Sequence, residues 1–239
     1  MKKIKLLGVL SIILIYVVLS LLINKSYILP SIIDILVSLK NIIFSKTFLI
    51  IIFTTIGRTL IGLIISFILA LCLAFLAYFN SKVKDFLEPF YVFFKTIPNI
   101  TYIIVALLWL GRDGSAILVA SLVVFPIFYN SILNALFNID VSLLEVTAMF
   151  DGSVFYKIRK VYLPLIKNDL LTSLGNCCSL GFKVSIMAEI LSQVKSGIGK
   201  ELYYAKSNFL MADIFAWTII IILISMLVDY LISLFIEKK

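Results

Sequence analysis

Charged residues inside apolar runs are the positions of this sequence that could carry chemistry. Lys95, Lys183 and Glu189 each lie within a stretch of mostly apolar residues. An ionisable group at membrane depth is costly unless it is paired or faces water, so it is a functional candidate by default. An anionic solute would favour Lys95 or Lys183 in its pathway, and Pro98 follows Lys95 by about one helical turn. The sequence therefore predicts a possible substrate pathway at Lys95, Pro98, Lys183 and Glu189.

Two alternatives stay open for these charges. Lys95 could extend its ammonium group to the cytoplasmic surface along an apolar stem, and any of the charges could form a structural ion pair with another helix. Lys183 and Glu189 are separated by about 1.7 helical turns, which is too far around a helix for them to pair with each other. Arg58 and Asp229 lie nearer the ends of apolar runs, where structural anchoring is favoured.

Enzymatic chemistry is not supported by the residue types present. The chain has no histidine, which excludes His-based triads, His metal ligands and imidazole relays. Its three cysteines, Cys72, Cys177 and Cys178, lie in apolar segments without C-x-x-C spacing, so packing is favoured over a metal or a disulfide. We expect no catalytic residue, no metal site and no cofactor, and therefore not an enzyme.

The composition indicates a membrane protein. Hydrophobic residues make up 62% of the 239 residues and charged residues only 14%, whereas a soluble domain has about half apolar and about a quarter charged residues. The apolar residues fall into several runs of about 20, the length of a membrane-spanning helix. The formal charge of +8 could suggest nucleic-acid binding, but the basic residues lie in short connectors, as the positive-inside rule predicts. We expect a lipid bilayer and no nucleic acid as the surroundings.

The predicted fold is therefore all-α, a polytopic membrane protein with about six transmembrane helices. The expected spans are residues 6–23, 48–79, 86–110, 115–137, 165–194 and 213–236, with a tight outer turn at 111–114. Residues 1–47 would hold the first span and a short external segment, and residues 48–239 the rest of the transmembrane domain. Basic residues are more frequent in the connectors that share a side with the two termini, which places both termini in the cytoplasm.

Small residues recur at a spacing of three or four residues in two of the spans, and at every fourth position in the first of them. The first stripe is Gly62, Ser66, Ala70 and Ala74, and the second is Cys178, Gly181, Ser185 and Ala188. Small residues let helices approach closely in lipid, where association depends on packing. The sequence leaves two interpretations open, packing within the chain and an interface or solute path between helices.

A polar connector at about residues 138–165 interrupts the spans. Ser142-x-x-Glu145 forms a capping-box pattern, so a short helix is expected to begin there. Gly152 fits the left-handed position that ends such a helix. Ser153 can cap a second short helix, and Pro164 would end it at the next span. Two short amphipathic helices can dock a soluble partner; a helix lying on the lipid surface is the alternative.

The pattern of this connector also resembles a known family. Glu145-x-x-Ala148-x-x-x-Gly152, followed by Leu163-Pro164, is similar to the EAA loop of ABC importer permeases. Val146-Thr147 departs from it, because the motif has alanine and a variable residue there. Further segments resemble the nitrate/sulfonate/taurine branch, at residues 53–58, 95–98, 109–114, 125–130, 188–191, 196–199 and 227–230.

The resemblance implies a permease subunit of an ATP-driven ABC importer in the bacterial cytoplasmic (inner) membrane. The solute would be small and anionic, like a sulfonate, nitrate or taurine, or else a thiamine precursor. The implied partners are two copies of an ABC ATPase, an extracytoplasmic substrate-binding protein and a second permease copy, giving a homodimer. Glu145, Ala148, Gly152, Leu163 and Pro164 would couple the permease to the ATPase.

The location of ATP hydrolysis follows from a missing motif. No G-x-x-x-x-G-K-[ST] sequence occurs in the chain, so hydrolysis would belong to a separate subunit. An ion channel or a secondary carrier that works without an ATPase is the alternative function. That alternative would not explain a capped connector suited to docking.

Overall fold

The computed structural model describes residues 2–23, 25–143 and 152–237, and each regular element within these ranges is helical. The elements are α1 (Lys2–Ile23), α2 (Ile32–Ile43), α3 (Phe48–Phe79), α4 (Ser81–Thr96), α5 (Asn99–Phe137), α7 (Val154–Lys157), the π-helical turn η1 (Ile158–Tyr162), α8 (Leu163–Leu165), α9 (Lys167–Ser192), α10 (Ile198–Ser207) and α11 (Met211–Glu237). The prediction of an all-helical membrane fold is confirmed.

Four helices in the described part of the chain are long and apolar enough to cross a membrane. They are α3, α5, α9 and residues 211–234 of α11. The first expected span is also helical, as the 22 residues of α1. The count of six spans is therefore approximate, because the third expected span is not one helix.

Pro98 divides the third expected span. Helix α4 ends at Thr96, Ile97 is extended, and Pro98 is the N-cap of α5. The residue before a proline is driven out of the helical region by the proline ring, which explains the extended Ile97.

The outer turn expected at 111–114 is also shorter, because only Gly111 leaves the helix, with φ 67° and ψ −169°. Glycine accepts this backbone conformation without strain.

Close packing of α3, α5 and α9 forms the centre of the bundle. A Cβ atom at Gly62 would lie 2.9 Å from both the Ala120 Cβ and the Ile117 carbonyl oxygen of α5. Ser66, Ala70 and Ala74 on the same stripe are buried as well. The first small-residue stripe therefore packs within the chain. Gly181 of the second stripe likewise packs against side chains of α3 and α5.

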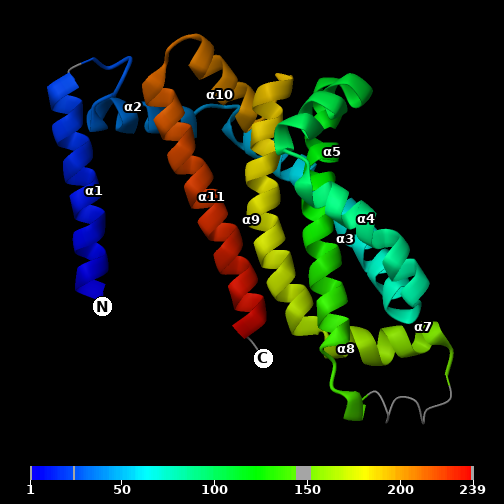
Figure 1. Cartoon of the computed structure of the whole chain (residues 1–239). Helices are drawn as coiled ribbons and strands as arrows, with labels where there is room; N and C mark the ends of the chain where they lie inside the picture. The colour runs from blue at the N-terminus through cyan, green and yellow to red at the C-terminus, as the bar shows by residue number, and fades with distance from the viewer. Residues whose placement is uncertain (1, 24, 144–151, 238–239) are drawn as a thin grey trace.

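The two ends of the bundle carry different elements. Helices α2 and α10 cross one end, and α7 and α8 lie at the other, toward which both chain termini point (Figure 1). The short external segment expected within residues 1–47 contains α2, and Ser31 and Asp34 form a capping box at the start of this helix. Helix α1 lies at the edge of the molecule (Figure 1). Its Tyr16 ring contacts Phe215 of α11, with the two ring centroids 5.7 Å apart.

Candidate functional site

A polar groove of about 730 Å³ lies between α4, α5 and α9. Asn130, Asn134 and Asn138 recur at every fourth residue of α5 and its C-cap, so they share one face. Asn176 of α9 and Lys95 of α4 also line the groove. These five side chains are exposed, so the groove opens on the surface of the chain. Polar groups at membrane depth are tolerated where they line a water-filled cavity.

The asparagine row was missed in the sequence, although its spacing was visible there. The pathway was predicted from charged residues, because burying a charge in an apolar environment costs the most free energy. Asparagine is a weaker signal, since it is also common in turns and helix caps. A row at every fourth position inside an expected span is the signal that could have found the groove. Pro98 itself is not in the lining, but its neighbours Ile97 and Asn99 are.

Lys183 lies in a second hollow, on another side of α9. This hollow has a volume of about 450 Å³ and lies between α9 and α11, where Lys183 and Asp229 both line it. The Ser179 hydroxyl donates a hydrogen bond to the Asp229 carboxylate across the two helices. Thr172 and Asn176 of α9 border both the hollow and the groove. The structure therefore places Lys95 and Lys183 in adjacent polar spaces without bringing them into contact.

Glu189 occupies a different environment, a buried ion-pair network with Arg58. The Arg58 Nη1 atom is 2.8 Å from Glu189 Oε1, and Nη2 is 2.7 Å from Asp113 Oδ1. Nη1 also donates to the Ser196 carbonyl oxygen at 2.6 Å. The Glu189 side chain is fully buried, whereas that of Asp113 is 46% exposed. Glu189 therefore forms a structural ion pair with another helix, which was the alternative to a place in the substrate pathway.

The same network fastens α10 to the bundle. The Thr55 hydroxyl donates to Glu189 Oε2 at 2.9 Å, and the Gly199 N–H donates to the same oxygen at 2.9 Å. The Ile198 N–H donates to Thr55 Oγ1 at 2.8 Å. A Cβ atom at Gly199 would lie 2.2 Å from the Glu189 Cβ, so only glycine leaves room for the approach. The Glu189 carboxylate of α9, the Thr55 hydroxyl of α3 and the backbone N–H groups at the start of α10 thus hold these three helices together.

Four of the seven segments that resemble the family meet in this network. Residues 53–58 supply Thr55 and Arg58, residues 188–191 supply Glu189, and residues 196–199 supply the loop backbone. Asp113 comes from the segment at 109–114. Sequence reasoning named Arg58 an anchor at the end of an apolar run, but it did not identify these partners. They lie up to 138 positions away in the chain.

At the opposite end, the start of the polar connector differs from the prediction. The cap is Asp140, whose Oδ1 accepts hydrogen bonds from the Ser142 N–H and hydroxyl at 2.9 Å each. These two bonds lower the pKa of Asp140 below its ordinary value. Ser142 therefore lies inside the first turn rather than capping it. Glu145 and Ala148 fall outside the described residues.

The expected conformation of Gly152 is wrong. This glycine is exposed and its φ is not in the left-handed region, so its backbone conformation does not require glycine. A Cβ atom there would lie 3.2 Å from Cδ1 of Tyr156. The next helix begins as predicted, because the Ser153 hydroxyl oxygen accepts from the Tyr156 N–H. Leu163 and Pro164 then form α8.

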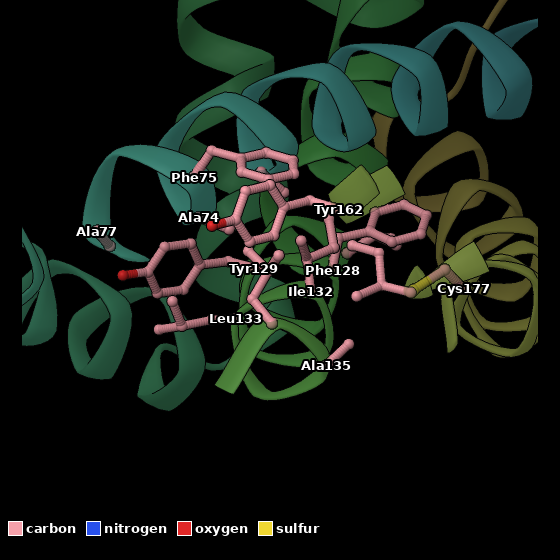
Figure 2. Close-up of a cluster of buried hydrophobic side chains, with 14 of the residues drawn as sticks. Ala74, Phe75, Ala77, Phe128, Tyr129, Ile132, Leu133, Ala135, Tyr162 and Cys177 are labelled. Carbon is pink, nitrogen blue, oxygen red and sulfur yellow. The ribbon is translucent and has the colours of Figure 1, made fainter. Parts of the chain in front are cut away.

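Tyr162 joins this connector to the membrane helices. Its side chain is buried in a cluster formed by α3, α5 and α9, together with Phe75, Phe128, Ile132 and Cys177 (Figure 2). The Tyr162 ring centroid lies 5.4–6.3 Å from three aromatic rings of α3, those of Phe75, Tyr78 and Phe79. Edge-to-face ring contacts at such distances are favourable. Tyr162 therefore packs η1 against α3.

The sequence is similar to those of known transport proteins. Residues 62–238 match the family model of the binding-protein-dependent transport system inner membrane component. A protein of Bacillus subtilis (strain 168) named as an aliphatic sulfonates transport permease protein, SsuC, is 25% identical over 214 residues, which are 89% of this chain and 76% of that protein. The glycine betaine/carnitine transport permease protein GbuB of Listeria monocytogenes serotype 1/2a (strain 10403S) is 22% identical over 160 residues, 66% of this chain and 56% of its own.

Solved structures show the same fold. Two inward-facing crystal forms of the MetNI methionine ABC transporter match with TM-scores of 0.69 and 0.70 at 17% and 16% identity. The matches cover 78% and 82% of this chain and 93% and 99% of the transporter chains. Since the family model spans most of the sequence, the chain belongs to the family of inner membrane components of binding-protein-dependent transport systems, as a permease of an ABC importer.

Proposed function

We propose that this permease carries a small anionic solute of the aliphatic sulfonate class into the cytoplasm. The polar groove carries the proposal, because its lining supplies one ammonium group at Lys95 and a row of side-chain amides. A sulfonate group offers three oxygen acceptors and no donor, so it matches the N–H donors of lysine and asparagine. The similarity to the sulfonate permease supports the same class.

The groove is suited to passage rather than to tight binding. Asn130, Asn134 and Asn138 repeat one hydrogen-bonding group along the C-terminal part of α5 and its C-cap. A solute can exchange one amide for the next along such a row, and transport requires sites weak enough to be left. Lys95, near the helix break at Pro98, would attract the anion to this row of asparagines.

We infer that a second copy of the chain covers the groove. An open polar groove facing lipid would leave amide groups without partners at a cost of several kcal/mol each. A homodimer would bring two grooves together around one aqueous path. Two ATPase copies would bind at the end that carries α7 and α8, and a substrate-binding protein would deliver the solute at the opposite end.

The positions of basic residues support an orientation in the membrane. Lys157, Arg159 and Lys160 lie in α7 and η1, at the end toward which both termini point. Basic residues beside the membrane favour the cytoplasmic side. We therefore propose that this end and both termini lie in the cytoplasm, and that Glu145, Ala148, Gly152, Leu163 and Pro164 couple the permease to the ATPase.

Replacing Lys95 tests the groove. In proteoliposomes containing the permease, its ATPase and its binding protein, Lys95→Met is expected to lower uptake of a labelled alkanesulfonate by about ten- to a hundredfold, the equivalent of one lost charged hydrogen bond. Lys95→Arg should retain most of the uptake, because it keeps the charge. Lys82→Met, at the exposed start of the same helix, serves as the matched control.

Unchanged uptake by Lys95→Met would remove Lys95 from the pathway. The residue would then be a surface lysine stacked on Tyr91, whose ring centroid is 5.5 Å from its Nζ. Transport of glycine betaine in place of the sulfonate by the wild-type assembly would contradict the proposed solute class.

A further inference from the structure

Helix α2 presents a broad apolar strip that stays exposed within the described part of the chain. The six large side chains of this strip are 38–80% exposed, and they are Ile32, Ile33, Leu36, Val37, Ile43 and Phe44. Residues spaced by three or four positions lie on one side of a helix, so the six are contiguous along α2 and its C-cap. We call them the apolar face. Contiguous exposed patches of this kind mark contact with a protein partner or with a membrane.

The opposite side of α2 is fixed to the bundle. Ile35 and Ser38 are buried, and the Ser38 hydroxyl donates a hydrogen bond to a carboxylate oxygen of Asp213 in α11 at 2.5 Å. Leu39 and Ile42 pack against the hydrophobic cluster shared by α3, α9 and α11. The helix therefore cannot turn its apolar face inward without breaking these contacts, so a partner outside the described chain has to cover that face.

The membrane-spanning helix that follows α2 exposes apolar side chains from its first turn. Residues 44–47 separate α2 from α3, and Leu49, Ile50 and Phe53 in the first two turns of α3 are exposed. Apolar side chains on the outside of a spanning helix face lipid, because their exposure to water is unfavourable. The last three residues of α1 are exposed and apolar as well. Helix α2 runs across the bundle rather than along α1 and α11 (Figure 1), so it lies at the depth where its neighbours leave the hydrocarbon layer.

Three exposed lysines accompany the apolar face. Lys25 precedes α2, Lys40 lies within the face and Lys46 follows the helix, and none forms an ion pair among the residues that the structure describes. A lysine can lay its apolar stem along a membrane surface while its ammonium group reaches the phosphates of the lipid headgroups. Tyr27, also exposed, is of the amphipathic type that is enriched at membrane interfaces. An apolar face with unpaired cations is typical of a helix that lies on an acidic lipid surface.

We propose that α2 is an in-plane anchor, whose apolar face inserts among the acyl chains of the nearer leaflet while its lysines bind the headgroups of acidic phospholipids. A second protein chain is the other class of partner that could cover the face. Lipid is favoured because the apolar face continues into the lipid-facing side of α3, whereas the groove that we assign to a second copy lies between α4, α5 and α9.

The anchor is independent of the solute and of the family match. Helix α2 precedes residue 62, where the match to the family model begins. The proposal requires only that α3 crosses a membrane, and the proposed orientation would make the nearer leaflet the outer one.

Photo-cross-linking within the assembled transporter tests the proposal. The photoreactive residue p-benzoylphenylalanine would replace Leu36 in the apolar face, or Asn41 on the exposed polar side of the same helix as the matched control. Permease, ATPase and binding protein would be reconstituted in liposomes with equal amounts of phosphatidylglycerol and phosphatidylcholine, and the mass of the irradiated permease would be measured. The Leu36 variant should gain mostly phospholipid, with phosphatidylglycerol enriched about fivefold or more, the effect of one lysine near an acidic surface. The Asn41 variant should gain little.

Two outcomes would overturn the lipid assignment. One is an adduct of the Leu36 variant with a second permease chain or with the binding protein, and the other is an equal phospholipid yield at positions 36 and 41. If the Leu36 variant does not assemble, p-benzoylphenylalanine at Phe44, at the far end of the apolar face, provides the same measurement.

The role of the lysines has its own control. Lys25→Gln/Lys40→Gln/Lys46→Gln should abolish the enrichment of phosphatidylglycerol among the adducts, and its persistence would contradict the assignment of these lysines to headgroups. Solute uptake would be measured in the same vesicles. Absent uptake by the wild-type assembly would count against the proposed function, whereas the cross-linking pattern alone decides the anchor.

Discussion

Replacing Arg58 by leucine is expected to destabilise the permease more than any other single substitution considered for this chain. The change removes the cation that contacts the fully buried Glu189 carboxylate at 2.8 Å. Breaking a buried ion pair from one side costs about 3–5 kcal/mol, because the remaining charge stays buried without compensation. The Ser196 carbonyl oxygen and Asp113 would lose their donor too. Thermal unfolding of the purified permease in detergent should show a large fall in the transition temperature.

Three further variants separate the buried charge from general damage. Arg58→Leu/Glu189→Leu should recover much of the lost stability, because no unpaired buried charge remains. Arg58→Lys should be intermediate, since a lysine lacks the planar fork that reaches several acceptors. Arg112→Leu, at an exposed arginine near the same end, should change little. A double variant less stable than Arg58→Leu would contradict this account of the network.

Tyr162→Ala is expected to separate ATP hydrolysis from transport. Its ring packs against Phe75, Tyr78 and Phe79 of α3, so its removal leaves a cavity where the connector meets the bundle. The ATPase should still bind and hydrolyse ATP, while solute uptake falls toward the level without ATP. Tyr156→Ala is the matched control, because Tyr156 lies in the same short helical segment but is 56% exposed.

Assembly has to be measured alongside uptake, because truncating a large core residue can cost about 3–5 kcal/mol. Tyr162→Phe keeps the ring in place and should transport nearly as well as wild type. If Tyr162→Ala assembles with the ATPase and still couples hydrolysis fully to uptake, then Tyr162 does not transmit movement to α3.

The apolar runs of the sequence predicted most of the long helices. The expected second span, 48–79, coincides with α3, and those at 165–194 and 213–236 differ from α9 and α11 by one or two residues at each end. Prolines were harder to interpret. Pro98 ends a helix, whereas Pro126 remains inside α5, where it is buried. Whether a proline breaks a helix depends on the packing around it, which a single sequence does not contain.

Local signals identified the cap at Ser153 but not the one at Asp140, and they misplaced the glycines with positive φ. Ser153 was recognised because its hydroxyl acts three residues away within one turn. The left-handed position was expected at Gly152, whereas positive φ occurs at Gly111 and Gly197. A side chain at Gly197 would collide with Thr55 and Glu189, because a Cβ atom there would lie 2.8–2.9 Å from their side-chain oxygens. Both of these buried residues come from other helices. Such long-range determinants also explain why the network around Arg58 was not predicted.

ATP-driven uptake by the reconstituted transporter tests the central claim most directly. Proteoliposomes would contain the permease, the ATPase and the binding protein, with a labelled alkanesulfonate on the binding-protein side. We expect accumulation of the solute against its gradient only when ATP, ATPase and binding protein are all present. Accumulation or leakage at the same rate without ATP would indicate a channel or a secondary carrier and would contradict the account.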